Sequence, residues 1–93
     1  MKFKFISAAF CVTSNAHNTF TELEIKLQLT RHLCGDWGDL SKSDKKANDV
    51  ALTTGDRILS AYNIGTRRMW IITDAEDDNG VRNYTTVLLP EDY

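Results

Sequence analysis

The residues most capable of chemistry lie in one short run, RHLCGDWGD at positions 31–39. Three of its side chains belong to types that bind metal ions or act in catalysis: His32, Cys34 and Asp36. A zinc site normally takes paired ligands from two places in the chain. The only other histidine is His17, and Cys11 falls in a predicted strand, so no matching pair is available. We therefore expect no metal site and no cofactor.

Nucleophilic catalysis by Cys34, with His32 as its base, is disfavoured by their spacing. Side chains two positions apart on a helix diverge, so the thiol and the imidazole do not meet. A structural role explains the run instead, as a helix end followed by a tight turn with Trp37 against a sheet. In that turn Asp36 and Asp39 would cap local backbone amides. We expect no enzymatic activity.

Charged residues gather in other parts of the chain. Residues 74–80, DAEDDNG, are similar to a calcium-binding loop, but the glycine falls one position late for an EF-hand and the flanks are strand-like. We expect a solvated hairpin loop there, with a negative patch.

The basic residues lie in a predicted helix and a predicted hairpin: Lys42, Lys45, Lys46, Arg67 and Arg68. Nucleic-acid binding needs such residues on one face with exposed aromatics between them. The aromatic candidates lie on predicted strands, where burial is the commoner outcome: Tyr62, Trp70 and Tyr84.

The stretch that leads into the run at 31–39 carries two conflicting patterns. Apolar and charged residues alternate through its middle, which is strand periodicity. Its start has a capping box formed by Thr21 and Glu24, and Gly35 suits the position just beyond a helix. We therefore predict a helix at residues 22–34. The alternative is a strand that forms a hairpin with residues 2–12.

A second helix is predicted between Ser41, a natural N-cap, and Gly55, which can end a helix in the left-handed conformation. Its apolar stripe is formed by Ala47, Val50 and Ala51. The lysines of this helix lie on the opposite face and are expected to be solvated.

Strands rich in β-branched and aromatic residues follow, at residues 57–62, 68–73 and 83–89. Short links separate them, and Asn79-Gly80 in the second link favours a tight turn. A further strand is predicted at residues 2–12, before a turn-rich segment at 14–18. The predicted fold class is α+β: a three-stranded antiparallel meander, which the N-terminal strand can extend, packed by two helices that cover one face.

Length and composition set the broad class. The chain has 93 residues, 42% hydrophobic and 26% charged, with a formal net charge of −2. These values describe one ordinary globular domain over residues 1–93, too small for a large cleft. Two cysteines do not define a disulfide framework. The apolar run near the N-terminus is short for a signal peptide and far too short for a membrane span, so we expect a cytoplasmic protein.

From residue 29 onward the chain carries a series of specific motifs: RH at 31–32, GDWGDL at 35–40, Asp44, ND and AL at 48–52, GDRILSAY at 55–62, WIITDA at 70–75 and TTVLLPEDY at 85–93. Together they resemble a group of small proteins of bacterial plasmids, integrative elements and phages, labelled plasmid-related proteins. The first 28 residues depart from the helical start that is usual in this group. The resemblance implies an origin on a mobile genetic element. It implies no activity and no site residues.

These features together predict a small non-catalytic protein that binds a host protein. The expected role is inhibition of a bacterial defence system, as by an anti-CRISPR protein that acts on a Cas effector. A standard interface of about 800 Å² per partner covers a large part of so small a protein. The expected anchors are Arg67, Arg68, Glu76, Asp77 and Asp78. The alternative is an accessory or regulatory protein of the element that binds nucleic acid through its lysines and arginines.

Overall fold

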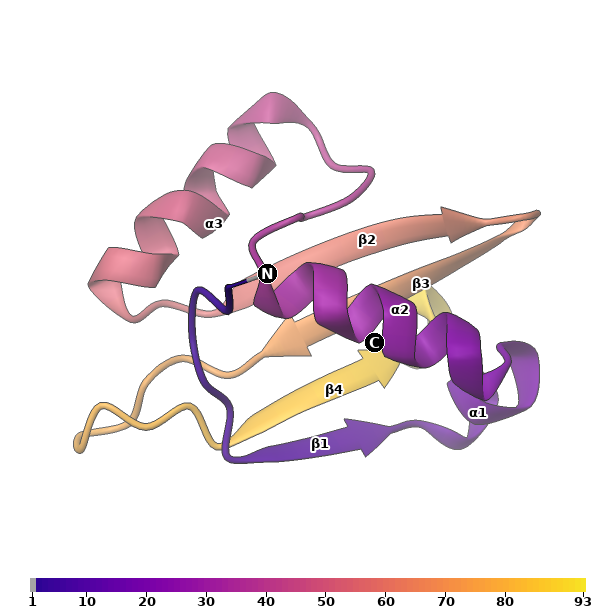
Figure 1. Ribbon diagram of the computed structural model, residues 1–93, viewed down its shortest axis with the longest axis horizontal. Coiled ribbons are helices and arrows are strands. Elements are labelled where there is room, and N and C mark those ends of the chain that lie inside the picture. Colours follow the sequence, from indigo (N-terminus) through magenta and orange to yellow (C-terminus); the bar gives the residue numbers. More distant parts are fainter. Residues whose placement is uncertain (1) are drawn as a thin grey trace.

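The computed structural model describes residues 2–93, and over these residues three α-helices accompany a four-stranded sheet (Figure 1). In chain order the elements are β1 (Ala9–Val12), α1 (Ser14–Thr19), α2 (Glu22–Leu33), α3 (Lys42–Thr54), β2 (Ile58–Ile64), β3 (Arg67–Thr73), β4 (Tyr84–Leu88) and the 3₁₀ helix η1 (Pro90–Asp92). None of the helices in this part of the chain is long and apolar enough to cross a membrane.

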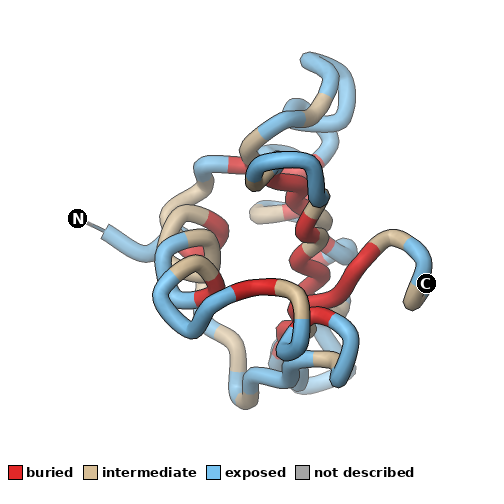
Figure 2. The backbone as a smooth tube through the Cα atoms, turned by 90° about the vertical axis from the view of Figure 1, so that its right-hand side faces the viewer, coloured by how far each residue is buried: buried red, intermediate tan, exposed pale blue. Residues whose placement is uncertain are grey.

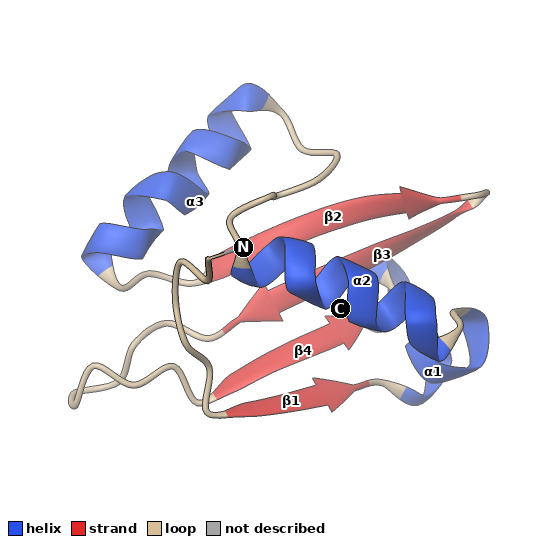
Figure 3. Ribbon diagram, in the orientation of Figure 1, coloured by secondary structure: helices blue, strands red, loops and turns tan. Residues whose placement is uncertain are grey.

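The sheet has the strand order β1-β4-β3-β2 (Figure 3). β2, β3 and β4 form an antiparallel meander, as predicted. β1 pairs with β4 in the parallel direction. The α+β class is therefore confirmed, and the sheet is mixed because of its N-terminal strand.

The predicted strand at residues 2–12 is much shorter than expected. Only Ala9–Val12 is a strand, in register with Tyr84 to Val87. The preceding residues cross to the end of α2, where the Lys4 N–H donates to the Leu33 carbonyl at 2.7 Å. The reason is Phe5, whose ring packs edge-on against the buried His32 at 5.4 Å between centroids. Packing of this ring in the core replaces the hydrogen bonds of a longer edge strand.

The turn predicted at residues 14–18 is also wrong, because this segment is the short helix α1. The Thr13 hydroxyl accepts a hydrogen bond from the Ala16 N–H at 3.1 Å and so caps the helix. Ala16 and Phe20 are buried in the main core. Serine and asparagine favour turns locally, but burial of these two apolar side chains selects the helix.

The helix predicted at residues 22–34 is confirmed as α2, and the strand alternative is excluded. The capping box forms as expected: the Thr21 N–H donates to Glu24 Oε1 at 2.8 Å, and the Glu24 N–H donates to Thr21 Oγ1 at 3.1 Å. Ile25 and Leu29 pack into the main core, whereas Leu23 and Leu27 are exposed. The helix therefore buries one side only.

The two faces of the sheet differ in what covers them. Figure 2 shows α2 on one side of the sheet and the C-terminus on the other. The face toward α2 holds the main core, with Tyr62, Met69, Ile71 and Val87 fully buried. The alternate positions of the strands point to the opposite face, which we call the open face. Its side chains include Leu59, Arg68, Trp70, Ile72 and Tyr84.

The second predicted helix is confirmed as α3, with Ser41 as its N-cap and Gly55 in the left-handed conformation (φ 82°). Its placement differs from the prediction, because α3 lies beside β2 and does not share the face covered by α2 (Figure 1). The predicted apolar stripe is only partly correct. Ala51 is buried, but Ala47 and Val50 are exposed, and the polar Asn48 is buried in their place.

Asn48 attaches α3 to the sheet by imitating a neighbouring strand. Its Nδ2 donates to the Leu59 carbonyl at 2.7 Å, and the Leu59 N–H donates to its Oδ1 at 3.2 Å. Both backbone groups of one residue on the outer edge of β2 are thus satisfied by a single side chain. Burial makes these bonds hard to replace with water.

Substitution Asn48→Ala is expected to lower the free energy of unfolding by about 1–3 kcal/mol, because it leaves the N–H and carbonyl of Leu59 without partners. Urea denaturation measures the change. The matched control is Asn79→Ala in an exposed loop, with an expected effect within about 0.5 kcal/mol. Equal effects of the two substitutions would contradict the assigned role of Asn48.

The rest of the β2 edge is covered by residues 37–39. The Asp39 N–H donates to the Ala61 carbonyl at 2.7 Å, and the Ala61 N–H donates to the Trp37 carbonyl at 3.3 Å. Between them Gly38 lies so close that a Cβ there would be 2.1 Å from the Ala61 oxygen. Trp37 is buried, as predicted. One edge of the sheet is therefore closed by the chain itself.

The link between β3 and β4 spans residues 74–83, one residue more than predicted. The predicted tight turn forms within it: the Gly80 N–H donates to the Asp77 carbonyl at 2.9 Å, and the Asp77 N–H donates to the Val81 carbonyl at 2.9 Å. The loop folds back on α3, where the Glu76 N–H donates to the Gly55 carbonyl at 2.8 Å. The side chain of Arg82 holds this arrangement from inside the protein.

Candidate functional site

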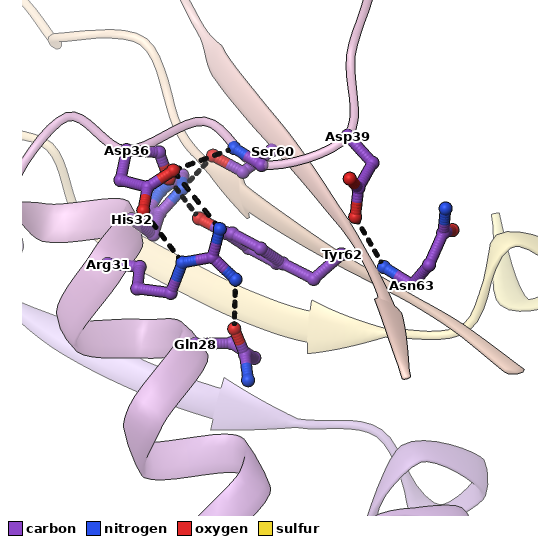
Figure 4. Close-up of polar contacts among 9 residues, drawn as sticks. Gln28, Arg31, His32, Asp36, Asp39, Ser60, Tyr62 and Asn63 are labelled. Atoms are coloured by element: carbon purple, nitrogen blue, oxygen red, sulfur yellow. Dashed lines mark hydrogen bonds and ion pairs between the residues drawn. The ribbon is translucent and has the colours of Figure 1, made fainter. Parts of the chain in front are cut away.

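A buried polar network lies between α2 and the sheet, next to a half-exposed ion pair (Figure 4). His32 is fully buried, with Nδ1 2.6 Å from Ser60 Oγ and Nε2 2.8 Å from Thr73 Oγ1. Thr73 Oγ1 is in turn 2.7 Å from Thr85 Oγ1. Both ring nitrogens of the histidine are therefore engaged by side chains of the sheet.

This network has the residue types of a catalytic site but not its accessibility. Burial, and secondarily the positive charge of Arg82, lower the pKa of His32 to about 3, so the imidazole is neutral at physiological pH. A neutral histidine beside a serine hydroxyl is a base–nucleophile pair in principle. Here Ser60 is also fully buried, so no substrate atom can approach its oxygen. Residues 2–93 contain no group of three or more His, Cys, Asp or Glu side chains that could hold a metal ion.

The half-exposed ion pair joins the end of α2 to the turn after it. Arg31 Nε donates to Asp36 Oδ2 at 2.8 Å, and its guanidinium carbon lies 4.7 Å from the centre of the Tyr62 ring. The hydrogen bond from Arg31 lowers the pKa of the Asp36 carboxyl, and burial raises the pKa of the Tyr62 phenol. Asp36 also caps the Gly38 N–H at 3.2 Å, which confirms the predicted local cap. The pair therefore joins the end of α2 to the turn at residues 36–38.

Asp39, predicted to cap a local amide, instead accepts from a residue far along the chain. Its Oδ2 takes a hydrogen bond from the Asn63 N–H on β2 at 2.8 Å (Figure 4). The turn at residues 36–39 is therefore joined to the sheet by both side chains and backbone.

The predicted anchors Arg67 and Arg68 lie at the β2–β3 hairpin. Arg67 reaches Glu91 of η1 at 3.4 Å, and both side chains are about half exposed. Arg68 donates to Asn63 Oδ1 at 2.8 Å and to the Asp39 carbonyl at 3.0 Å. The two arginines are adjacent in sequence but point to opposite faces of the sheet, because successive strand residues alternate.

The predicted acidic anchors lie in the loop at the other end of β3. Glu76 Oε2 is 3.9 Å from the buried Arg82 guanidinium. Asp77 accepts from the N–H groups of Asn79 and Val81, which lower the pKa of its carboxyl together with a bond from Asn83. Asp78 is exposed. Glu76 and Asp77 thus organise their own loop.

The structure does not bring the two sets of predicted anchors together. The arginines are the first two residues of β3 and the acids follow its end, so the length of the strand separates them, about 20 Å at the usual rise per residue. The lysines of α3 form a third group. Lys42 and Lys46 lie about 120–160° around the helix from Asp44 and Asn48, which line the groove between α3 and the sheet. The predicted arginines, the predicted acidic residues and the lysines of α3 therefore occupy three different parts of the surface.

Aromatic and arginine side chains meet on the open face, in a group that we call the open-face cluster: Arg57, Arg68, Trp70 and Tyr93. The rings of Trp70 and Tyr93 are edge-on with centroids 5.8 Å apart. Arg57 Nη1 donates to the Tyr93 hydroxyl at 2.6 Å. Tyr93 is nevertheless 70% exposed. These residue types are the ones most enriched at the energetic centres of protein interfaces.

A groove of about 370 Å³ opens beside this cluster, between α3 and the sheet. Ala47 and Asn48 line it from the helix, and Leu59, Arg68 and Trp70 line it from the strands. The indole Nε1–H of Trp70 is buried without a hydrogen-bond partner in residues 2–93. Such a donor is uncommon in a folded protein. The groove makes this part of the open face the candidate site.

Sequence reasoning found only Arg68 of this cluster. Trp70 and Tyr84 were expected in the core, but Trp70 is only partly buried and Tyr84 is half exposed, whereas Tyr62 is buried as expected. Arg68 and Trp70 are two positions apart on one strand, so the sequence predicts that they lie on the same face of the sheet. The approach of Tyr93 depends on the path of the chain after β4, and no local pattern reports it.

No protein-family model, no curated protein and no solved structure matches the chain.

Proposed function

We propose that this protein is a non-catalytic binding protein of a mobile genetic element that inhibits a host defence system. The partner is a host protein complex such as a Cas effector, which would make the protein an anti-CRISPR protein. Inhibition follows from occupation of a functional surface of the partner. The observation that carries the proposal is the open-face cluster with its adjacent groove.

Three properties of the cluster support protein binding. Tryptophan, tyrosine and arginine side chains supply large contact area together with hydrogen-bond donors. The groove beside Trp70 and Arg68 accepts a side chain from a partner. The cluster also includes Arg68, one of the anchors predicted from the sequence, whereas Arg67 points to the opposite face of the sheet. The acidic anchors Glu76, Asp77 and Asp78 lie outside this surface and would contact a second region of a large partner.

Substitution Tyr93→Ala is expected to weaken partner binding by more than tenfold, about 2 kcal/mol, because it removes an exposed aromatic anchor. The double substitution Tyr93→Ala with Arg68→Ala should abolish inhibition. The protein is expressed in bacteria with an intact CRISPR system, and phage interference and co-purifying proteins are measured. Leu23→Ala, an equally exposed apolar residue on α2, is the matched control and should leave both readouts unchanged.

Two outcomes would overturn the proposal. One is the absence of any enriched host protein together with undiminished interference when the wild-type protein is expressed. The other is equal loss of binding in the Tyr93 variant and the Leu23 control, which would exclude the open face as the contact surface. Circular dichroism of each variant verifies that the fold is retained.

A second candidate function is nucleic-acid binding, favoured by one observation. Arg57 and Arg68 share the open face with Trp70 and Tyr93, and single-stranded nucleic acids bind to such sheets by stacking on aromatic rings beside basic groups. Against it, Lys42 and Lys46 lie on the far side of α3 from this face. Binding should weaken steeply with salt. Absence of a gel shift at low salt with single- and double-stranded DNA and RNA would exclude this candidate.

A further inference from the structure

The two edges of the sheet differ sharply in how they are protected. Residues 37–39 and Asn48 cover the outer edge of β2. The outer edge of β1 has no neighbouring strand within residues 2–93. The Ala9 and Thr13 N–H groups donate to Asn83 and Val87 beside β1. The alternate residues Phe10 and Val12 therefore direct their backbone N–H and carbonyl groups outward.

This edge also lacks the charges that usually protect an edge strand. Natural proteins place lysine, other charged residues or proline at exposed edges to prevent pairing with another chain. Residues 5–16, which contain β1 and its flanks, include no charged side chain, no histidine and no proline. Two identical edges of this kind can approach without repulsion between like charges.

Apolar side chains surround the edge and form a knob and a hollow. On the side toward α2, Phe10 is 51% exposed and Val12 is 41% exposed. Beside Phe10 a shallow hollow of about 210 Å³ is lined by Phe3, Ile6 and Leu33. Beside Val12 a larger hollow of about 440 Å³ is lined by Phe20, Ile25 and Leu29, with His17, Glu22 and Lys26 also on its wall. Phe10 is thus the knob, and the hollow beside Val12 is large enough for an aromatic ring.

We infer that β1 pairs with β1 of a second copy of this chain in an antiparallel, two-fold symmetric dimer. Phe10 and Val12 are the residues of each copy whose backbone N–H and carbonyl groups point outward. When both residues form hydrogen bonds with the second copy, Phe10 lies opposite Val12 of the partner. Residues opposite each other in antiparallel strands point to the same side of the sheet. The Phe10 ring of each copy therefore enters the hollow beside Val12 of the other, and the symmetry repeats the contact.

The same register places Cys11 on the two-fold axis, opposite Cys11 of the second copy. This position is a non-hydrogen-bonded pair, in which the Cα atoms of antiparallel strands are about 4.5 Å apart. That separation is within the usual range for a disulfide, about 4.4–6.8 Å. Cys11 is free and exposed. The cysteine is a reporter of the register; the dimer itself requires no disulfide.

The expected dimer is reversible. Four exposed apolar side chains lie around the edge: Phe3, Ile6, Phe10 and Val12. Together they present an accessible surface area on the order of 400 Å² per copy, which is about half of what each partner contributes to a standard interface. Edge-to-edge pairing would produce one continuous sheet, with both α2 helices on one side and both open faces on the other. The inference does not rest on the proposed function, because oligomeric state is measured without a host partner.

Light scattering after size-exclusion chromatography is expected to show a dimer that dissociates on dilution. Val12→Lys adds a charge to the edge and should raise the dissociation constant by at least about tenfold. Leu23→Lys, which adds the same charge to the exposed side of α2, is the matched control and should leave it unchanged. Both residues are exposed, so both variants should fold, and circular dichroism verifies this.

Oxidation with diamide tests the register. Two paired thiols lose two electrons and two protons to diamide, which becomes the hydrazine, and a disulfide-linked dimer remains. Wild type and Cys34→Ser should form this dimer, and Cys11→Ser should not form it but should remain dimeric by light scattering. A monomer at millimolar concentration, a dimer lost in Leu23→Lys but not in Val12→Lys, or no Cys11 crosslink in a dimeric sample would each overturn the inference.

Discussion

Substitution Arg82→Met is expected to lower the free energy of unfolding by about 3–5 kcal/mol. Arg82 is only 4% exposed. Its Nη1 donates to the carbonyls of Asp56 at 2.7 Å and Asp74 at 2.9 Å, and its Nη2 donates to the carbonyl of Ala51 at 3.0 Å. One guanidinium therefore joins the end of α3, the start of β2 and the end of β3.

The large effect follows from the acceptors that the substitution would leave behind. Methionine fills most of the volume of arginine but donates no hydrogen bond, so the carbonyls of Asp56 and Asp74 would lose their partner. The carbonyl of Ala51 would keep only the Gly55 N–H. Arg82→Lys should show an intermediate loss, because one ammonium group cannot reach all three in the planar geometry of a guanidinium. Loss of Arg82 also leaves the loop at residues 74–83 without its main attachment to α3.

Thermal and urea denaturation measure this effect, with an expected fall in Tm of roughly 15–30 °C. The control is Arg67→Met, which removes an exposed pair with Glu91 and should cost less than about 1 kcal/mol. A loss below about 1 kcal/mol in Arg82→Met would show that the buried arginine does not hold the loop.

The stability of the protein is expected to fall between pH 6.5 and pH 4.5 because of His32. Burial lowers the pKa of this histidine from 6.5 to about 3 in the folded protein. Below pH 6.5 the unfolded chain therefore binds a proton that the folded protein does not bind, and unfolding becomes more favourable. The contribution is fully present above the unfolded pKa and is lost as pH falls toward the folded pKa. Each pH unit in this window costs about 1.4 kcal/mol, so the expected loss is about 2–3 kcal/mol at pH 4.5.

Urea denaturation at several pH values measures the slope. The substitution His32→Gln keeps a neutral side chain that can bond to Ser60 and should remove most of this pH dependence, although it lowers stability at neutral pH. His17→Gln, at an exposed position, is the control and should retain the wild-type slope. The dependence of stability on pH in wild type and in His17→Gln tests the role of His32 even if the His32 variant does not fold. A flat profile between pH 6.5 and 4.5 in both would contradict a neutral, buried His32.

Local signals in the sequence were sufficient for the long elements. The ends of α2 and α3 depend on Thr21, Glu24, Ser41 and Gly55, which act within one helical turn of themselves. The meander of β2, β3 and β4 follows from strand propensity and short connections. Interactions between residues close in the sequence can be predicted from the sequence, because they do not depend on how the rest of the chain folds.

The pairing of β1 and the helix α1 could not be read in the same way. Residues 14–18 contain residues that favour turns, and only the burial of Ala16 and Phe20 in the core selects the helix. The parallel pairing of β1 with β4 joins segments separated by most of the chain. Its geometry depends on where the intervening elements place the two strands, and no local pattern in either strand specifies it.

The candidate site shows the same division. The sequence alone determined that arginines, acids and aromatics are present, that neighbouring strand residues alternate between faces, and that residues 5–16 are uncharged. The tertiary structure decided which of these side chains are exposed. Arg82 and Arg68 are the same residue type, yet one is buried under three carbonyls and the other lines a groove. The reason is physical: burial, edge exposure and the unpaired Trp70 N–H depend on contacts between distant segments, which exist only once the chain has folded.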